Sequence, residues 1–282
     1  MKAEARIDMP RGGVGSLNRV KNNIPGAKLL RGKIAIVTGS TKGNGRAIAE
    51  LFSAHGSKVV IVGRNEREAL AVAREIGQKY KTSPLGLKAD LTSRDDVVEM
   101  VKRTLEKYER GIDILVNNAG FPIITELWDA PFHEISDDDL KRVLEVDTIG
   151  TFRCCREVLP IMTRQNRGVI INISSTPAIA GYGKGAPYTI AKSAILGITK
   201  HIAKEYGRYG IRSNTIAPGT IATRRNWDRL SATEKLDLVS AIPLGRPGQP
   251  EDIAGVALML ASGYATFVNG QTIVVDGGEV TL

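Results

Sequence analysis

The sequence predicts an α/β fold in which helices cover both faces of a mostly parallel, seven-stranded sheet. Short apolar runs alternate with longer helical patterns from Gly32 onward. Most runs are continuously apolar rather than alternating, which indicates strands buried on both faces. The alternation shows no break in composition, so residues 32–282 are expected to form a single domain, preceded by a basic arm over residues 1–31.

The expected strands follow the apolar runs at residues 34–38, 58–62, 85–89, 112–116, 168–173, 211–216 and 272–275. The expected helices follow stretches in which apolar residues recur every three or four positions, at residues 46–55, 66–80, 94–109, 137–163, 188–209 and 251–261. Regular alternation of these elements is typical of a doubly wound sheet.

The turn after the first expected strand is rich in glycine and opens the first expected helix. It reads Thr-Gly-Ser-Thr-Lys-Gly-Asn-Gly over residues 38–45. Its glycines let backbone amides approach an anion closely, and the helix N-terminus adds partial positive charge. Strand, glycine turn and helix together predict a site for the pyrophosphate of a dinucleotide cofactor. The expected cofactor-binding residues here are Gly39, Ser40, Thr41, Lys42, Gly43, Asn44 and Gly45.

The end of the second strand bears on which dinucleotide binds. An enzyme that selects NAD is expected to place a carboxylate there for the ribose 2′-hydroxyl, and the segment at residues 62–65 contains none. Arg64 follows the strand instead, and Lys42 precedes the second glycine of the turn. Two cations suit a 2′-phosphate, because Arg can bind it through two parallel hydrogen bonds. NADP(H) is therefore the expected cofactor, with NAD less favoured; the alternative is a pair of solvated surface cations.

A serine, a tyrosine and a lysine have the spacing needed for proton transfer at a carbonyl oxygen. Tyr188 and Lys192 lie one turn apart on the same helix face, and Ser175 follows the fifth strand. A free phenol has a pKa near 10, so a phenolate at neutral pH needs about 4 kcal/mol of stabilisation. An ammonium at about 4 Å supplies roughly that much at an effective dielectric constant of about 20. We therefore expect Tyr188 to be the general acid/base, with Lys192 lowering its pKa and Ser175 binding the carbonyl oxygen.

These motifs resemble those of the short-chain dehydrogenase/reductase family. The glycine turn fits the family pattern TGxxxGxG, residues 117–120 read NNAG, and Ser175 stands thirteen residues before Tyr188, as in the family. The resemblance runs from about Gly32 to Asp276. It implies a Rossmann-type fold and hydride transfer between a nicotinamide cofactor and a ketone or secondary alcohol.

The resemblance also implies roles for residues after the later strands. The carboxylate of Asp90 would hold the adenine amino group, and NNAG would pass close under the adenosine ribose. The segment after the sixth strand would meet the nicotinamide carboxamide, and Lys192 would hold the nicotinamide ribose. The cofactor-binding residues implied in this way are Asp90, Leu91, Asn118, Ala119, Gly120, Tyr188, Lys192, Pro218, Gly219, Ile221 and Thr223.

Two positions depart from the family pattern. Asn44 stands where most members carry an aliphatic residue, and it can donate a hydrogen bond beside the pyrophosphate. Asp147 stands where the family usually has an asparagine. In relatives the backbone carbonyl at this position holds a water that relays protons to the lysine, a role that survives Asn→Asp. Asp147 is therefore counted as a fourth catalytic residue, and its carboxylate would raise the pKa of Lys192 if the two are close.

Two segments are expected to shape the substrate pocket. Residues 121–135 run longer than is common after NNAG, and residues 224–242 stand where relatives have a mobile lid. The second segment carries Trp227 and three arginines, Arg224, Arg225 and Arg229. These arginines are interpreted as binding a phosphate, a carboxylate or a CoA-like tail of the substrate; the alternative is that they are simply solvated. The pattern is most similar to 3-oxoacyl-thioester reductases, with sugar or polyol dehydrogenases next. The resemblance implies a homotetramer built on the long helices that carry Phe152 and Tyr188.

The charge is concentrated in the arm. Of the formal net charge of +9, residues 1–31 carry +5, from seven basic and two acidic side chains. We interpret the arm as mobile or draped on a neighbouring subunit; the alternative is a nucleic-acid tether. The basic arm also favours a different functional class for the whole protein, a non-catalytic NADP-sensing or nucleic-acid-binding protein. The intact Ser-Tyr-Lys set argues against that class.

The cysteine content fits a cytoplasmic protein, and the resemblance implies a small-molecule carbonyl or alcohol substrate. The only cysteines, Cys154 and Cys155, are neighbours and form no disulfide framework, which fits a reducing compartment. No CxxC, HExxH or histidine cluster occurs, so no metal is expected. The longest apolar or small run, near residues 253–261, is too short to span a bilayer. The N-terminus lacks the apolar core of a secretory signal.

Overall fold

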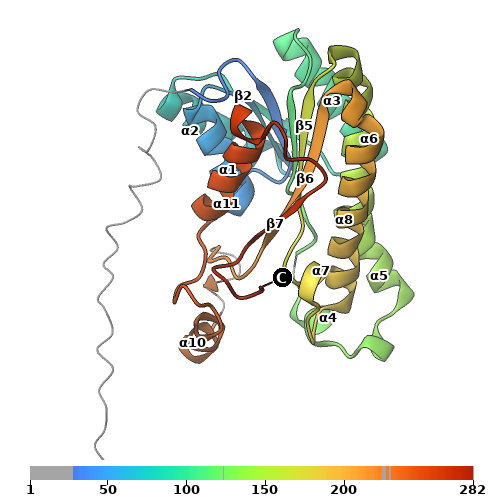
Figure 1. Ribbon diagram of the computed structural model, residues 1–282, viewed down its shortest axis with the longest axis vertical. Coiled ribbons are helices and arrows are strands. Elements are labelled where there is room, and N and C mark those ends of the chain that lie inside the picture. The colour runs from blue at the N-terminus through green and yellow to red at the C-terminus, as the bar shows by residue number, and fades with distance from the viewer. Residues whose placement is uncertain (1–27, 123, 224–226, 229, 282) are drawn as a thin grey trace, which may run out of the picture.

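The described residues form one parallel sheet with helices on both faces (Figure 1). The structure is a computed structural model that describes residues 28–122, 124–223, 227–228 and 230–281. The strand order is β3-β2-β1-β4-β5-β6-β7, and every neighbouring pair is parallel. The predicted doubly wound fold is therefore confirmed, with its change of direction between β1 and β4. The strands are β1 (Ile34–Val37), β2 (Lys58–Gly63), β3 (Leu85–Lys88), β4 (Ile114–Asn117), β5 (Gly168–Ile173), β6 (Ile211–Pro218) and β7 (Thr272–Val275).

Helices of very different length connect the strands. Within the described ranges, none is long and apolar enough to cross a lipid bilayer. The helices are α1 (Gly43–Ala54), α2 (Glu66–Tyr80), α3 (Arg94–Tyr108), α4 (Thr125–Asp129), α5 (Asp137–Leu144), α6 (Gly150–Gln165), α7 (Pro177–Ala180), α8 (Ala186–Tyr206), α10 (Ala232–Ser240) and α11 (Pro250–Ala261), with shorter turns η2 (Phe132–Glu134), η3 (Glu145–Ile149), η4 (Gly207–Tyr209) and η5 (Gly263–Ala265).

Two apolar cores lie on opposite faces of the sheet. Figure 1 shows α1 and α11 on one side of the strands and α6 and α8 on the other. Phe52 of α1 and Ile253 of α11 belong to the first core, and Val158 of α6 and Ile202 of α8 belong to the second. Burying an apolar side chain of this size stabilises the fold by about 1.5–3 kcal/mol. Because both faces are covered, the strands are apolar at successive positions.

The packed part of the chain begins before Gly32. Leu30 is only 1% exposed and belongs to the core beside α1. Its backbone N–H donates to the carbonyl oxygen of His55 at 3.0 Å. The last residues of the predicted arm segment thus join the fold, while residues 1–27 lie outside the described residues.

The stretch predicted as one helix over residues 137–163 is divided into three parts. Ser136 caps α5 by accepting a hydrogen bond from the Asp139 amide. After α5 comes η3, a wide π-helical turn, and α6 follows it. The predicted helical stretch is present, but a period of three or four apolar residues does not show that it contains one extra residue at a π-helical turn.

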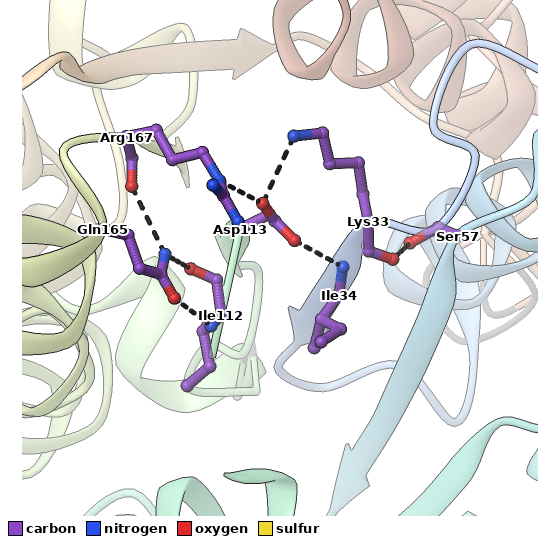
Figure 2. Close-up of polar contacts among 7 residues, drawn as sticks. All are labelled: Lys33, Ile34, Ser57, Ile112, Asp113, Gln165 and Arg167. Atoms are coloured by element: carbon purple, nitrogen blue, oxygen red, sulfur yellow. Dashed lines mark hydrogen bonds and ion pairs between the residues drawn. The ribbon is translucent and has the colours of Figure 1, made fainter. Parts of the chain in front are cut away.

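A polar cluster joins the amino ends of β1, β4 and β5, at the end of the sheet opposite the glycine turn (Figure 2). The Asp113 carboxylate accepts a hydrogen bond from the Ile34 amide at 3.0 Å. It also accepts from Arg167 Nε at 3.0 Å and from Lys33 Nζ at 3.3 Å. Burial disfavours the charge, but these donors outweigh burial and hold the pKa of Asp113 below its usual range. Three chain segments are thereby fixed to one carboxylate.

A buried polar ladder crosses the sheet nearer its carboxyl end. Asn117, Asn172 and Thr215 occupy matching register positions on β4, β5 and β6. Asn117 Nδ2 donates to Asn172 Oδ1 at 2.8 Å, and Asn172 Nδ2 donates to Thr199 Oγ1 of α8, also at 2.8 Å. The hydroxyls of Thr199 and Thr215 share a hydrogen bond of 2.7 Å. The ladder therefore fixes α8 against the strands that carry the site.

Candidate active site

The glycine turn forms a cradle at the carboxyl end of β1. Gly39 and Gly43 adopt positive φ angles of 62° and 56°, which a residue with a side chain rarely adopts. A Cβ on Gly39 would also lie 2.8 Å from the Ala119 Cα. Asn118 Nδ2 donates to the carbonyl oxygens of Thr38 and Gly39 at 2.9 and 3.0 Å. The NNAG segment thus holds the turn in shape.

The cradle fits the pyrophosphate of a dinucleotide. Helix α1 begins at Gly43, and the residue before it, Lys42, is the N-cap. The Lys42 side chain makes no capping hydrogen bond to the amides of the first turn. The amides of the first turn are therefore available to an anion, which the helix dipole also favours. Asn44 Oδ1 is buried and finds no hydrogen-bond partner in the described part of the chain. This oxygen is an acceptor, so it does not test the expectation that Asn44 donates a hydrogen bond beside the pyrophosphate.

Other turn residues have structural roles. Ser40 is fully buried; its hydroxyl donates to the Val37 carbonyl at 2.7 Å and accepts from the Val62 amide at 3.0 Å, so it joins β1 to β2. Thr41 packs against Gly63, where a Cβ would be 2.7 Å from its methyl carbon.

The second strand ends in exposed positive charge. Lys42 and Arg64 are both exposed. Asp90 accepts hydrogen bonds from the amide and hydroxyl of Thr92 at 2.9 and 2.7 Å. These bonds, opposed by burial and helped by the charges of Arg64 and Lys88, lower the pKa of Asp90. Arg64 and Asp90 therefore lie near each other. Leu91 is instead a buried core residue against α6, where its carbonyl accepts from Arg153.

Helix α8 carries the tyrosine and the lysine of the candidate catalytic set. Lys192 is buried, and its Nζ lies 5.6 Å from the centroid of the Tyr188 ring. Its Nζ donates to the Ile173 carbonyl at 3.3 Å, and the Ser174 hydroxyl donates to the Lys192 carbonyl at 2.8 Å. The end of β5 thus fixes the lysine from two sides. Ser175, which follows Ser174, donates from Oγ to the Pro218 carbonyl at 3.3 Å.

Asp147 lies in the π-helical turn η3 and faces the same lysine. Its Oδ2 is 3.5 Å from Lys192 Nζ, and its Oδ1 accepts a hydrogen bond from the Phe121 amide at 2.6 Å. Burial opposes the charge of Lys192, but the carboxylate of Asp147 and the negative charge of an ionised Tyr188 outweigh it. The pKa of Lys192 is therefore raised. The expected closeness of Asp147 to the lysine is present.

The segment after β6 faces the glycine turn across the site. Pro218 and Gly219 continue from the strand, and the Gly219 amide donates to the Val275 carbonyl at 3.1 Å. Ile221 forms a parallel bridge with Gly248. A Cβ built on Gly43 would be 3.6 Å from the Thr223 methyl carbon. Thr223 therefore stands close to the turn. The resemblance places the nicotinamide end of the cofactor at the segment that carries Thr223, and the pyrophosphate at the turn.

One continuous cleft of about 2370 Å³ joins these parts and extends beyond them along α1 and α11. Thirteen of the predicted site residues line it: Thr41, Lys42, Gly43, Asn44, Asn118, Gly120, Ser175, Tyr188, Lys192, Pro218, Gly219, Ile221 and Thr223. The predicted residues outside its lining are Gly39, Ser40, Gly45, Arg64, Asp90, Leu91, Ala119 and Asp147.

An aromatic wall beside Tyr188 comes from the long segment after NNAG. Trp128 of α4 lies edge-on to Tyr188, with ring centroids 5.7 Å apart, and 5.8 Å from the ring of Tyr182. The Gly185 amide donates to the Trp128 carbonyl at 2.8 Å, and Lys184 Nζ donates to Asp129 Oδ1 at 2.6 Å. The length of residues 121–135 predicted a pocket segment, but nothing in the sequence paired it with the loop before α8.

The predicted lid is only partly described. Trp227 lines the cleft, and α10 follows with a capping box between Ser231 and Glu234. Figure 1 shows α4, α7 and α10 at one end of the molecule, below the strands in that view. Arg224, Arg225 and Arg229 lie outside the described residues.

Comparison with known proteins places this site in a family. A sequence model of the family described as enoyl-(acyl carrier protein) reductase matches residues 39–279. A 3-oxoacyl-(acyl-carrier-protein) reductase of Aquifex aeolicus is 40% identical over 88% of this chain and 98% of its own length. An uncharacterized short-chain type dehydrogenase/reductase of Sinorhizobium fredii is 36% identical over 89% of this chain and 98% of its own. The chain belongs to the short-chain dehydrogenase/reductase family.

Solved structures agree with this assignment. The chain of a 7α-hydroxysteroid dehydrogenase complexed with NADH and 7-oxo glycochenodeoxycholic acid matches with a TM-score of 0.83 at 32% identity, covering 90% of this chain and 97% of that one. The resemblance drawn from the sequence motifs is thus confirmed. As a short-chain dehydrogenase/reductase, the protein is an oxidoreductase that acts on a ketone or an alcohol.

Proposed function

We propose that this protein reduces the ketone of a 3-oxoacyl thioester with NADPH, or catalyses the reverse oxidation. The observation that carries the proposal is the buried Lys192 ammonium, 5.6 Å from the centre of the Tyr188 ring, on a cleft that Ser175 also lines. The 3-oxoacyl reductase of Aquifex aeolicus, at 40% identity, supports the substrate class.

The nicotinamide cofactor, when bound, supplies the hydride that reaches the carbonyl carbon. The protein's own residues handle the proton and the oxygen. Tyr188 donates its phenolic proton to the carbonyl oxygen, Ser175 hydrogen-bonds that oxygen, and the charge of Lys192 stabilises the phenolate that remains. Lys192 Nζ has three donors; Ile173 and Asp147 take two of them, which leaves one for a ribose hydroxyl.

The choice of NADPH rests on Lys42 and Arg64. Both are exposed at the carboxyl ends of β1 and β2, and Arg64 is close enough to Asp90 to affect its pKa. These positions suit the 2′-phosphate of the adenosine ribose. The hydroxysteroid dehydrogenase with bound NADH makes NADH the competing cofactor to test.

Two further properties belong to this proposal. Ser175, Tyr188 and Lys192 would act in a homotetramer built on α6 and α8, where Phe152 of α6 is 51% exposed and Ile190 of α8 is 39% exposed. The cytoplasm is the proposed location, which fits Cys154 and Cys155 as buried free thiols.

The test is the oxidation of NADPH, followed by its absorbance, with a 3-oxoacyl thioester, a sugar ketone and a steroid ketone. We expect the thioester to have the highest kcat/KM and Tyr188→Phe to lose at least about a thousandfold in kcat. Tyr209→Phe, a matched change in the turn η4 that follows α8, should keep wild-type turnover. Turnover by Tyr188→Phe at a tenth of the wild-type rate or more would remove Tyr188 from the mechanism.

A further inference from the structure

Asp147 and Lys192 form an ion pair that is almost completely withdrawn from water. The side chains are 0% and 5% exposed, and their charged atoms are 3.5 Å apart. Asp147 Oδ2 has no hydrogen-bond partner elsewhere in the described part of the chain, so the ammonium is its partner. Burying an unpaired carboxylate costs the folded state much free energy. Asp147 can therefore stay ionised at this position only while Lys192 is charged.

Three separate segments build this pair. The π-helical turn η3 brings Asp147 to the site, and the Phe121 amide holds its Oδ1 at 2.6 Å. Gly120 leaves the space between them: a Cβ there would lie 3.0 Å from Asp147 Oδ1 and 3.3 Å from Lys192 Nζ. The absence of a side chain at Gly120 thus leaves room for Asp147 and Lys192 to approach each other.

Few other charges act at this point. Asp147 and Tyr188 are the groups whose charges act to raise the pKa of Lys192. Glu145, on the same turn as Asp147, is paired with Arg153 at 2.6 Å. Arg142 of α5 lies over the Phe121 ring, 5.7 Å from its centroid. The hydroxyl of Ser175 faces the Pro218 carbonyl. The charged pair nearest the Tyr188 ring in these contacts is thus Asp147 with Lys192.

The carboxylate changes what the ammonium does for the phenol. Alone, the positive charge of Lys192 favours ionisation of Tyr188; a neighbouring negative charge offsets part of that effect. It also keeps Lys192 charged despite its burial. Removing the negative charge should therefore let the phenol lose its proton at a lower pH.

We propose that Asp147 is a positioning residue that acts through Lys192: its carboxylate fixes the ammonium and offsets its charge, so that Tyr188 keeps its proton to a higher pH. A protonated Tyr188 is the form that reduces a ketone. The carboxylate thus extends ketone reduction to more alkaline conditions. This inference rests on the proposed function, but part of its test does not require turnover.

The first experiment is a spectrophotometric titration of tyrosinate in the full-length protein. The difference between wild type and Tyr188→Phe isolates the titration of Tyr188. The same difference is measured in the Asp147→Asn background with the double variant. We expect the Tyr188 midpoint to fall by about 0.5–1 pH unit in Asp147→Asn. An unchanged or higher midpoint overturns the inference, and a higher one would mean that Lys192 had lost its own charge.

The second experiment is the pH profile of kcat/KM for ketone reduction with NADPH. The alkaline limb should move to lower pH by a similar amount in Asp147→Asn. The matched control is Asp113→Asn, the same change at a carboxylate at the opposite end of the sheet, which should leave the limb unmoved. A uniform loss of activity with no movement of the limb would reduce Asp147 to a structural role. Absence of turnover with every ketone would defeat the proposed function, while the titration still decides the inference.

Discussion

The indole of Trp128 lies edge-on to the phenol ring of Tyr188, with ring centroids 5.7 Å apart. The contact joins a short helix after β4 to the helix that carries the candidate acid/base. It also places an aromatic side chain on the cleft wall next to the expected position of the reacting carbonyl. Trp128 can therefore orient Tyr188 and limit the shape of the substrate at once.

Trp128→Ala should lower kcat/KM for the ketone by about two- to tenfold, in addition to the loss caused by the smaller apolar contact area. The reason is that an aromatic pair contributes about 0.5–1.5 kcal/mol beyond the burial of its apolar surface. The KM for NADPH should change little. Trp128→Phe keeps an aromatic edge and should retain most of the activity. Steady-state kinetics with both substrates varied would show this split, and an equal loss for Ala and Phe would contradict the packing role.

Arg64→Ala should erode the preference for NADPH. Losing one charge-assisted contact of about 1.5–3 kcal/mol implies a drop of roughly ten- to hundredfold in kcat/KM for NADPH, with NADH unaffected. The measurement is kcat/KM with both cofactors at fixed ketone concentration. Arg67→Ala, an exposed arginine on the next helix, is the matched control. Equal losses with NADPH and NADH would mean that Arg64 supports the fold instead.

Asp113→Asn should destabilise the protein by about 1–3 kcal/mol at neutral pH, because two cations and an amide face this carboxylate (Figure 2). The folded-state pKa of Asp113 is lowered. Its contribution is therefore fully present above the unfolded pKa, near 3.9, and is lost as the pH falls through the lower folded value.

Urea unfolding at a series of pH values tests this. The difference between wild type and Asp113→Asn should be constant from pH 7 to about pH 4 and shrink only in stronger acid. Asp138→Asn, which breaks an exposed pair with Lys141, should cost less than about 0.5 kcal/mol throughout. A gap that shrinks already at neutral pH would show that another group titrates.

Deletion of residues 1–25 should leave kcat of the assembled enzyme almost unchanged, because every predicted site residue lies beyond Thr38. If the arm drapes over a neighbouring subunit, the shortened protein should dissociate or melt earlier. If it is a nucleic-acid tether, assembly should persist while weak, salt-dependent binding to duplex DNA disappears. Light scattering, melting curves and a DNA titration at two salt concentrations separate these outcomes.

The parts of the fold that follow local rules could be predicted from the sequence. The apolar runs and the glycine turn gave the strands, their βα alternation and the position of the cradle. Tyr188 and Lys192 are four residues apart on one helix, so their common face follows from helix geometry. Ser175 and Pro218 meet because both end parallel strands that are neighbours in the sheet.

The remainder depends on contacts between distant segments. Nothing in the sequence places Trp128 against Tyr188, since the two are sixty residues apart and the contact needs the loop at Gly185. The distance from Asp147 to Lys192 likewise depends on a turn whose extra residue leaves the apolar pattern intact. Leu30 joined the core although the charge pattern around it indicated an arm. Burial of one leucine outweighed the local composition.

The extra residue in the turn Glu145–Ile149 has a consequence for how this region can vary. Each added residue advances the phase of a helix by about 100°, so α5 and α6 are out of phase although they follow one another directly. Deleting one residue from the turn would let α5 and α6 join as one regular α-helix. Either Asp147 would then rotate away from Lys192, or Cys154 and Val158 would rotate out of the core. We therefore expect this region to accept no change in length.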